Sequence, residues 1–173
     1  MIMRSGQQQL LLPASPVFIW CTLVAALLLN MLPLGRVPWM PDFLALVLLF
    51  WSVHQPLKVG IGIAFMFGLA MDVHHTALLG QHAFSYTALS FLASLIQRRL
   101  LWFKVPLQAL QVLPLLGAAH GMELILRLLS GGVFPGWVVL IAPLAEALLW
   151  PLASVLLLVP QLRAPDPDEN RPL

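Results

Sequence analysis

The sequence predicts an all-α fold, in the form of a polytopic integral membrane protein with six transmembrane helices. Of its 173 residues, 60% are hydrophobic and only 9% are charged, whereas a soluble domain carries about 25% charged residues. The mean hydropathy of the chain is +0.91. So few charged side chains cannot cover a globular surface, which argues against a soluble enzyme, a nucleic-acid-binding protein and a disordered regulator.

Six apolar stretches, separated by proline, glycine and charged residues, account for the predicted helices. A membrane crossing takes about 20 mostly apolar residues, and the second and third stretches lie near the lower limit of that length. These two are expected to be short spans or a shallow pair that does not fully cross. The six stretches cover residues 16–34, 39–55, 57–73, 80–97, 105–129 and 135–160.

The six stretches belong to one membrane domain, and both ends of the chain are expected in the cytoplasm. We assign residues 1–15 to a cytoplasmic N-terminal segment, 16–160 to the membrane domain and 161–173 to a disordered cytoplasmic tail. Orientation follows from Lys and Arg, which favour the cytoplasmic side. Seven of them fall inside in this arrangement, namely Arg4, Lys58, Arg98, Arg99, Lys104, Arg163 and Arg171. Two fall outside, Arg36 and Arg127.

A stripe of small residues marks the third stretch. Gly60, Ala64, Gly68 and Asp72 recur every four residues and therefore share one face of a helix. Small residues at this spacing let membrane helices approach closely. The stripe could pack inside the bundle or dock the helix of a partner, and we hypothesise that it forms or supports a partner contact.

The loop after this stretch begins at Asp72, which is either solvated or accepts hydrogen bonds that fix the shape of the loop. His74, His75 and His82 follow within the next ten residues. Their spacing matches no closed metal site. We therefore expect solvated loop histidines and no metal ion.

The fifth and sixth stretches carry ionisable groups at membrane depth, where such groups are costly and are candidates for function. Glu123 and Arg127 are spaced to neutralise each other on one helix face. His120 and Glu146 lie equally far from the turn between the two stretches. They are expected to face each other or a shared cavity, either as a pair that holds the hairpin together or as a binding site for a partner or ligand.

No catalytic motif accompanies these groups. The sequence has no HExxH metalloprotease motif and no GxSxG nucleophile turn. We expect neither an enzyme nor a cofactor. The candidate partner-binding or structural polar residues are Asp42, Gly60, Ala64, Gly68, Asp72, Gly80, His120, Glu123, Arg127 and Glu146.

The order of several short motifs resembles the MreD family of bacterial rod shape-determining proteins. The motifs are Pro38-Trp39-Met40-Pro41-Asp42, Trp51, Gly60, Gly68, Asp72, Leu79-Gly80, Arg98-Arg99 and Leu149-Trp150-Pro151. The resemblance covers residues 16–160, and its most specific part is the block Gly68, Asp72 and Leu79-Gly80 with the upstream Pro41-Asp42.

The resemblance implies a non-catalytic subunit of the bacterial inner membrane. Members of the family work with the single-span protein MreC and the MreB filament system. The same machinery contains RodA and a transpeptidase penicillin-binding protein, which build the lateral peptidoglycan wall. The family also resembles the six-helix substrate-binding subunits of energy-coupling-factor transporters. The alternative function is therefore a membrane carrier with a small-molecule site at His120, Glu123 and Glu146.

Overall fold

The computed structural model describes residues 14–32, 40–76 and 78–161, which form helices and no strands. This confirms the all-α prediction for the described residues. The predictions for residues 1–13 and 162–173, including Arg4, Arg163 and Arg171, lie outside them, as does Arg36. The helices are α1 (Pro16–Met31), α2 (Phe43–His54), α3 (Ile61–His75), α4 (Gln81–Leu101), α5 (Val105–Leu129) and α6 (Ile141–Leu158), with 3-10 turns η1 (Trp137–Leu140) and η2 (Val159–Gln161) flanking α6.

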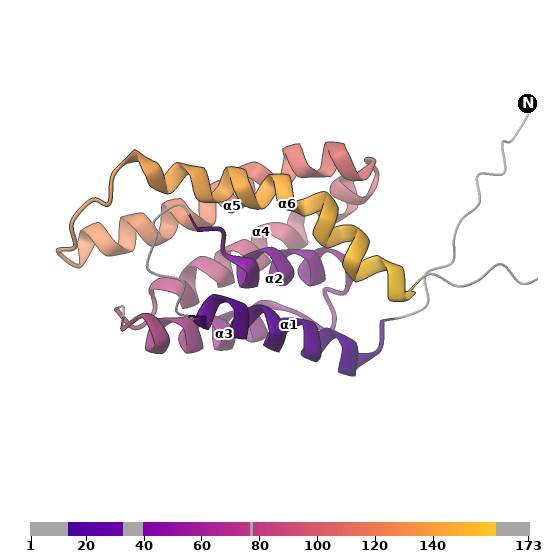
Figure 1. The fold of residues 1–173 in the computed structure, drawn as a ribbon, viewed down its shortest axis with the longest axis horizontal. Helices are drawn as coiled ribbons and strands as arrows, with labels where there is room; N and C mark the ends of the chain where they lie inside the picture. The colour runs from indigo at the N-terminus through magenta and orange to yellow at the C-terminus, as the bar shows by residue number, and fades with distance from the viewer. Residues whose placement is uncertain (1–13, 33–39, 77, 162–173) are drawn as a thin grey trace, which may run out of the picture.

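The helices alternate in direction along the bundle. Figure 1 shows α1, α3 and α5 beginning at one end, where α2, α4 and α6 finish. Lys58, between α2 and α3, and Lys104, directly before α5, therefore lie at the same end as the last turn of α4. We call this end the basic end. The opposite end carries the first turns of α2, α4 and α6.

Helix α2 is the centre of the core. Nine of its 12 residues are buried, and it packs against α1, α4 and α6. A helix that is apolar all round is stable only inside a protein or a membrane. At a rise of about 1.5 Å per residue it is roughly 18 Å long, so its neighbours, rather than lipid, cover most of it.

Helix α4 holds α2, α3 and α5 together and is the most polar of the six helices. The hydroxyl oxygens of Ser52 on α2 and Ser90 on α4 lie 3.0 Å apart. Ser85 on α4 donates to the carbonyl of Ala119 on α5 at 3.0 Å. Polar residues of α4 thus face inward and find partners on neighbouring helices.

Two stretches combine the length and the apolarity of a membrane crossing within the described residues. They are Val105–Leu129 and Trp137–Gln161. The helices α1, α2 and α3 are apolar but shorter. The second and third predicted stretches correspond to the shortest helices, α2 with 12 residues and α3 with 15.

Several predicted boundaries are wrong by a few residues, for local reasons. Helix α2 begins after Asp42, whose side chain caps its first turn, and α3 begins after Gly60 rather than at residue 57. Helix α4 continues to Leu101 instead of ending at residue 97. Arginines at 98 and 99 do not stop a helix, because basic residues are favourable in its last turn.

Candidate functional site

Asp42 lies directly before α2 and joins that helix to α1 and α4. Its Oδ1 accepts hydrogen bonds from the backbone N–H of Ala45 (2.9 Å) and from Nδ2 of Asn30 on α1 (2.6 Å). The hydroxyl of Tyr86 on α4 donates to Oδ2. Asn30 also accepts from the backbone N–H of Phe43 at 3.1 Å. The carboxylate therefore caps α2 and connects three helices.

Glu146 extends these contacts to α5 and α6. Its Oε1 accepts from the backbone N–H of Asp42 at 2.8 Å, and Nε2 of His120 lies 3.3 Å from the same oxygen. This contact confirms the prediction that His120 and Glu146 face each other. We call the residues that link these helices the Asp42 cluster: Asn30, Asp42, Tyr86, His120 and Glu146.

Glu123 and Arg127 do not form the predicted ion pair, although both are described. Glu123 is partly buried, and the nearby polar groups that influence its carboxyl are Ser85 and His82 on α4 and His120 on its own helix. Arg127 is exposed in the last turn of α5. A spacing rule for residues on one isolated helix does not include the polar groups of a neighbouring helix, here α4, that compete for the carboxylate of Glu123.

Asp72 is fully buried at the end of α3 and anchors the start of α4. Its Oδ2 accepts from the backbone N–H groups of Gly80 (2.8 Å) and Ala83 (3.3 Å). Its Oδ1 accepts from the backbone N–H of His82 (2.7 Å) and lies 2.8 Å from Nδ1 of that residue. Of the two alternatives for Asp72, the structure has the one in which it fixes the loop. Gly80 permits this arrangement because its φ of 107° is a left-handed conformation.

The small-residue stripe of α3 faces α4 and is therefore not a free docking surface. A Cβ on Gly68 would lie 2.4 Å from the Cα of Ala83 on α4, and Ala64 is fully buried. The glycines at the corresponding spacing on α5 behave differently. A Cβ on Gly117 or Gly121 would have no neighbour within 4 Å, so no other helix of the described chain approaches this pair closely.

The three histidines are not all solvated as predicted, because His82 is buried in the first turn of α4. Nδ1 of His75 and Nε2 of His82 lie 3.4 Å apart, and His82 is also bound to Asp72. Among residues 14–32, 40–76 and 78–161, no group of three or more His, Cys, Asp or Glu side chains could hold a metal ion.

Positive and negative charges are segregated along the bundle. Four of the five described Lys and Arg residues lie at the basic end, and Arg127 lies at the other. All four described carboxylates lie in the half away from the basic end: Asp42, Asp72, Glu123 and Glu146. The Asp42 cluster and the Asp72 cap therefore belong to the same half of the molecule.

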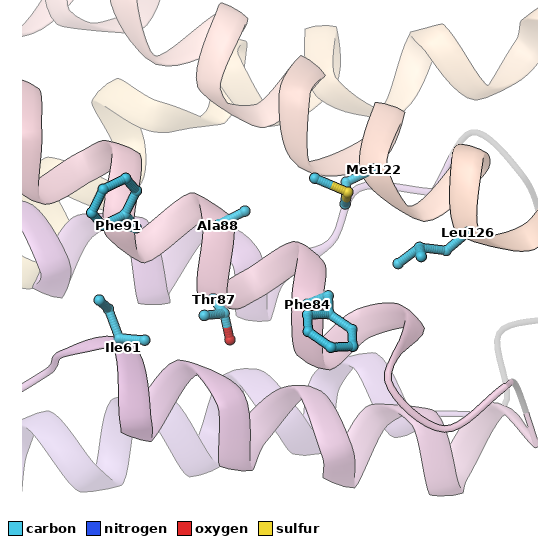
Figure 2. A pocket seen from close by; sticks show the side chains of 7 residues that line it. All are labelled: Ile61, Phe84, Thr87, Ala88, Phe91, Met122 and Leu126. Atoms are coloured by element: carbon cyan, nitrogen blue, oxygen red, sulfur yellow. The ribbon is translucent and has the colours of Figure 1, made fainter.

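An apolar groove opens between the start of α3, α4 and α5 (Figure 2). Its volume is about 460 Å³. Phe84 and Phe91 on its rim are 58% and 49% exposed, and Ala88 lies between them on α4. The hydroxyl of Thr87 is bound to the carbonyl of Ala83 at 2.6 Å. The full lining is Ile61, Phe84, Thr87, Ala88, Phe91, Met122 and Leu126.

Sequence reasoning did not identify Asn30 and Tyr86 as partners of Asp42. Both carried a signal, because each is a polar side chain within an apolar stretch and Tyr86 is the single tyrosine of the chain. Such groups need hydrogen-bond partners in a membrane bundle.

Comparisons with known proteins agree with the resemblance found in the sequence. A family model described as rod shape-determining protein MreD matches residues 9–160. The chain is also similar to the rod shape-determining protein MreD of Haemophilus influenzae, with 31% identity over 129 residues, which cover 72% of this chain and 77% of that protein. No solved structure is significantly similar to the chain, so its likeness to energy-coupling-factor subunits stays a prediction. The chain belongs to the MreD family of membrane proteins, which act in rod shape determination.

Proposed function

We propose that the chain is a non-catalytic, multi-pass subunit of the bacterial cell-elongation machinery that binds MreC within the inner membrane. Through that contact it supports the organisation of lateral peptidoglycan synthesis, in one complex with MreB, RodA and a transpeptidase penicillin-binding protein. Membership of the MreD family supports the cellular role. The apolar groove is the observation that carries the binding mechanism.

The topology that we propose has six spans and both termini in the cytoplasm. The alternating directions of the helices support an even number of crossings (Figure 1). The segregation of charge supports the orientation, because Lys and Arg favour the cytoplasmic side and the basic end holds four of the five described ones. Short α2 fits this arrangement because neighbouring helices cover nine of its 12 residues, whereas α3 packs mainly against α4 and leaves apolar side chains such as Met66 exposed.

The groove is the best candidate for the contact with MreC because the polar candidates are already used inside the bundle. Asp42, Asp72 and Glu146 are each bound to neighbouring helices or loops. The groove, by contrast, offers aromatic and aliphatic side chains from three helices. Helices associate in membranes through close apolar packing, so a side chain of a single-span partner can fill this space.

Filling the groove tests this mechanism. Ala88→Phe places an aromatic ring in the space between α4 and α5, and we expect co-purification of MreC from membranes to fall at least about fivefold. The matched control is Leu148→Phe on α6, whose side chain is 81% exposed and lies outside the groove. Suppose that the Ala88→Phe variant has the same thermal unfolding midpoint as the unmodified chain. Unchanged recovery of MreC with this variant would then rule out the groove as the contact.

The carrier function has one observation in its favour. Oε2 of Glu146 is buried and has no hydrogen-bond partner among the described residues. This oxygen is therefore available to accept a hydrogen bond from a ligand. A native mass spectrum of the purified protein separates the two functions. Our proposal predicts no small molecule bound in stoichiometric amount, whereas the carrier function predicts one that is lost in Glu146→Gln.

A further inference from the structure

The corner between α4 and α5, residues 98–104, combines exposed basic and aromatic side chains at the basic end. Arg98, Arg99 and Lys104 are all exposed. Trp102 is 89% exposed and Phe103 is 37% exposed. Tryptophan favours the membrane–water interface, because it combines an apolar ring with a polar N–H.

The backbone of this corner is fixed even though its side chains are exposed. Leu100 is fully buried and its carbonyl accepts from the backbone N–H of Phe103 at 3.2 Å. Nε2 of Gln108 donates to the carbonyl of Phe103 at 3.0 Å. The indole N–H of Trp150 on α6 donates in turn to Oε1 of Gln108 at 3.2 Å. The basic side chains therefore project from a preformed turn, which lowers the entropic cost of binding a ligand.

The positive charge of the corner is not balanced within the described chain. The ion pairs among described residues are His82 with Asp72 and His120 with Glu146, and both lie in the opposite half. Lys58, at the same end, differs because its ammonium group donates to the carbonyl of Ala14 at 2.7 Å. Three basic groups within seven residues are thus exposed at the basic end without an acidic neighbour among the described residues.

We propose that residues 98–104 bind the headgroup phosphate of an anionic phospholipid at the face of the membrane. Arginine offers planar donors that match a phosphate, and Lys104 adds a compact positive charge. Trp102 and Phe103 contact the acyl chains just below the headgroup. Charge complementarity selects an anionic lipid over a zwitterionic one, because a basic residue near the surface attracts anionic lipid appreciably.

Native mass spectrometry with two competing lipids tests the proposal. The full chain, purified in a nonionic detergent, is mixed with equal amounts of phosphatidylglycerol and phosphatidylcholine that carry the same acyl chains. We expect phosphatidylglycerol to be retained at least about fivefold in excess, and Arg98→Gln/Arg99→Gln to reduce this preference to about one. Lys104→Gln should reduce it in part. Arg127→Gln removes one positive charge at the other end, as Lys104→Gln does at the corner, and should leave the preference intact.

Two results would overturn the proposal. The first is equal retention of the two lipids by the unmodified chain, and the second is full preference in the folded Arg98→Gln/Arg99→Gln variant. Millimolar inorganic phosphate should not displace the lipid, because a free phosphate lacks the acyl chains.

Discussion

Replacing Gly68 with alanine is expected to lower the free energy of unfolding by about 2–3 kcal/mol or more. The new Cβ would lie 2.4 Å from the Cα and 2.6 Å from the N of Ala83. Backbone atoms cannot rotate away as a flexible side chain can, so α3 and α4 must separate. Asp72, one turn further along α3, would then lose the geometry with which it anchors α4. Reversible unfolding in mixed micelles measures the loss.

Gly62 provides the control for this prediction. It lies on the same helix, and a Cβ on it would meet nothing within 4 Å. Gly62→Ala should therefore leave the free energy of unfolding unchanged or raise it by up to about 1 kcal/mol, because alanine favours a helix over glycine. If the two variants unfold alike, the close packing of α3 on α4 does not stabilise the bundle as described.

Replacing Asp42 with alanine is expected to cost about 3–5 kcal/mol. The change removes the cap of α2, worth roughly 1 kcal/mol. It also leaves two groups without their acceptor, at about 1–3 kcal/mol for the buried hydroxyl of Tyr86 and about 1 kcal/mol for the half-buried amide of Asn30. Asp42→Asn keeps one acceptor oxygen and should cost less. The same unfolding measurement gives the magnitude.

Ser94→Ala is the control for the loss of a single exposed hydrogen bond. Its hydroxyl bonds the carbonyl of Phe91 at 2.6 Å on the exposed side of α4, and its removal should cost well under 1 kcal/mol. A loss as small for Asp42→Ala would mean that the carboxylate of Asp42 does not hold α1, α2 and α4 together.

The sequence predicts well those features that depend on neighbours along the chain. The number and approximate positions of the helices follow from runs of apolar residues. The pairing of His120 with Glu146 follows from their equal distance from the turn between α5 and α6, because such a hairpin brings these positions side by side. The contact of 3.3 Å between them agrees with that reasoning.

Features that depend on which helices are neighbours in the bundle could not be predicted in this way. Asp42 contacts Tyr86, 44 positions away, and periodicity does not reveal which helices lie next to each other. The same limit explains the error at Glu123, which lies near polar side chains of α4 and forms no pair with Arg127. Ala64, Gly68 and Asp72 share one face of α3 as predicted, whereas Gly60 precedes the helix. Only the structure identifies α4 as the helix that covers this face.

Photocrosslinking in the membrane is the most direct test of the central claim, that the groove between α4 and α5 binds MreC. A benzoylphenylalanine residue at position 91, on the rim of the groove, should form a crosslink to MreC in cells. The same residue at position 148 on α6, where the native leucine is 81% exposed, should crosslink lipid or nothing. A crosslink to MreC from position 148 but not from position 91 would contradict the claim.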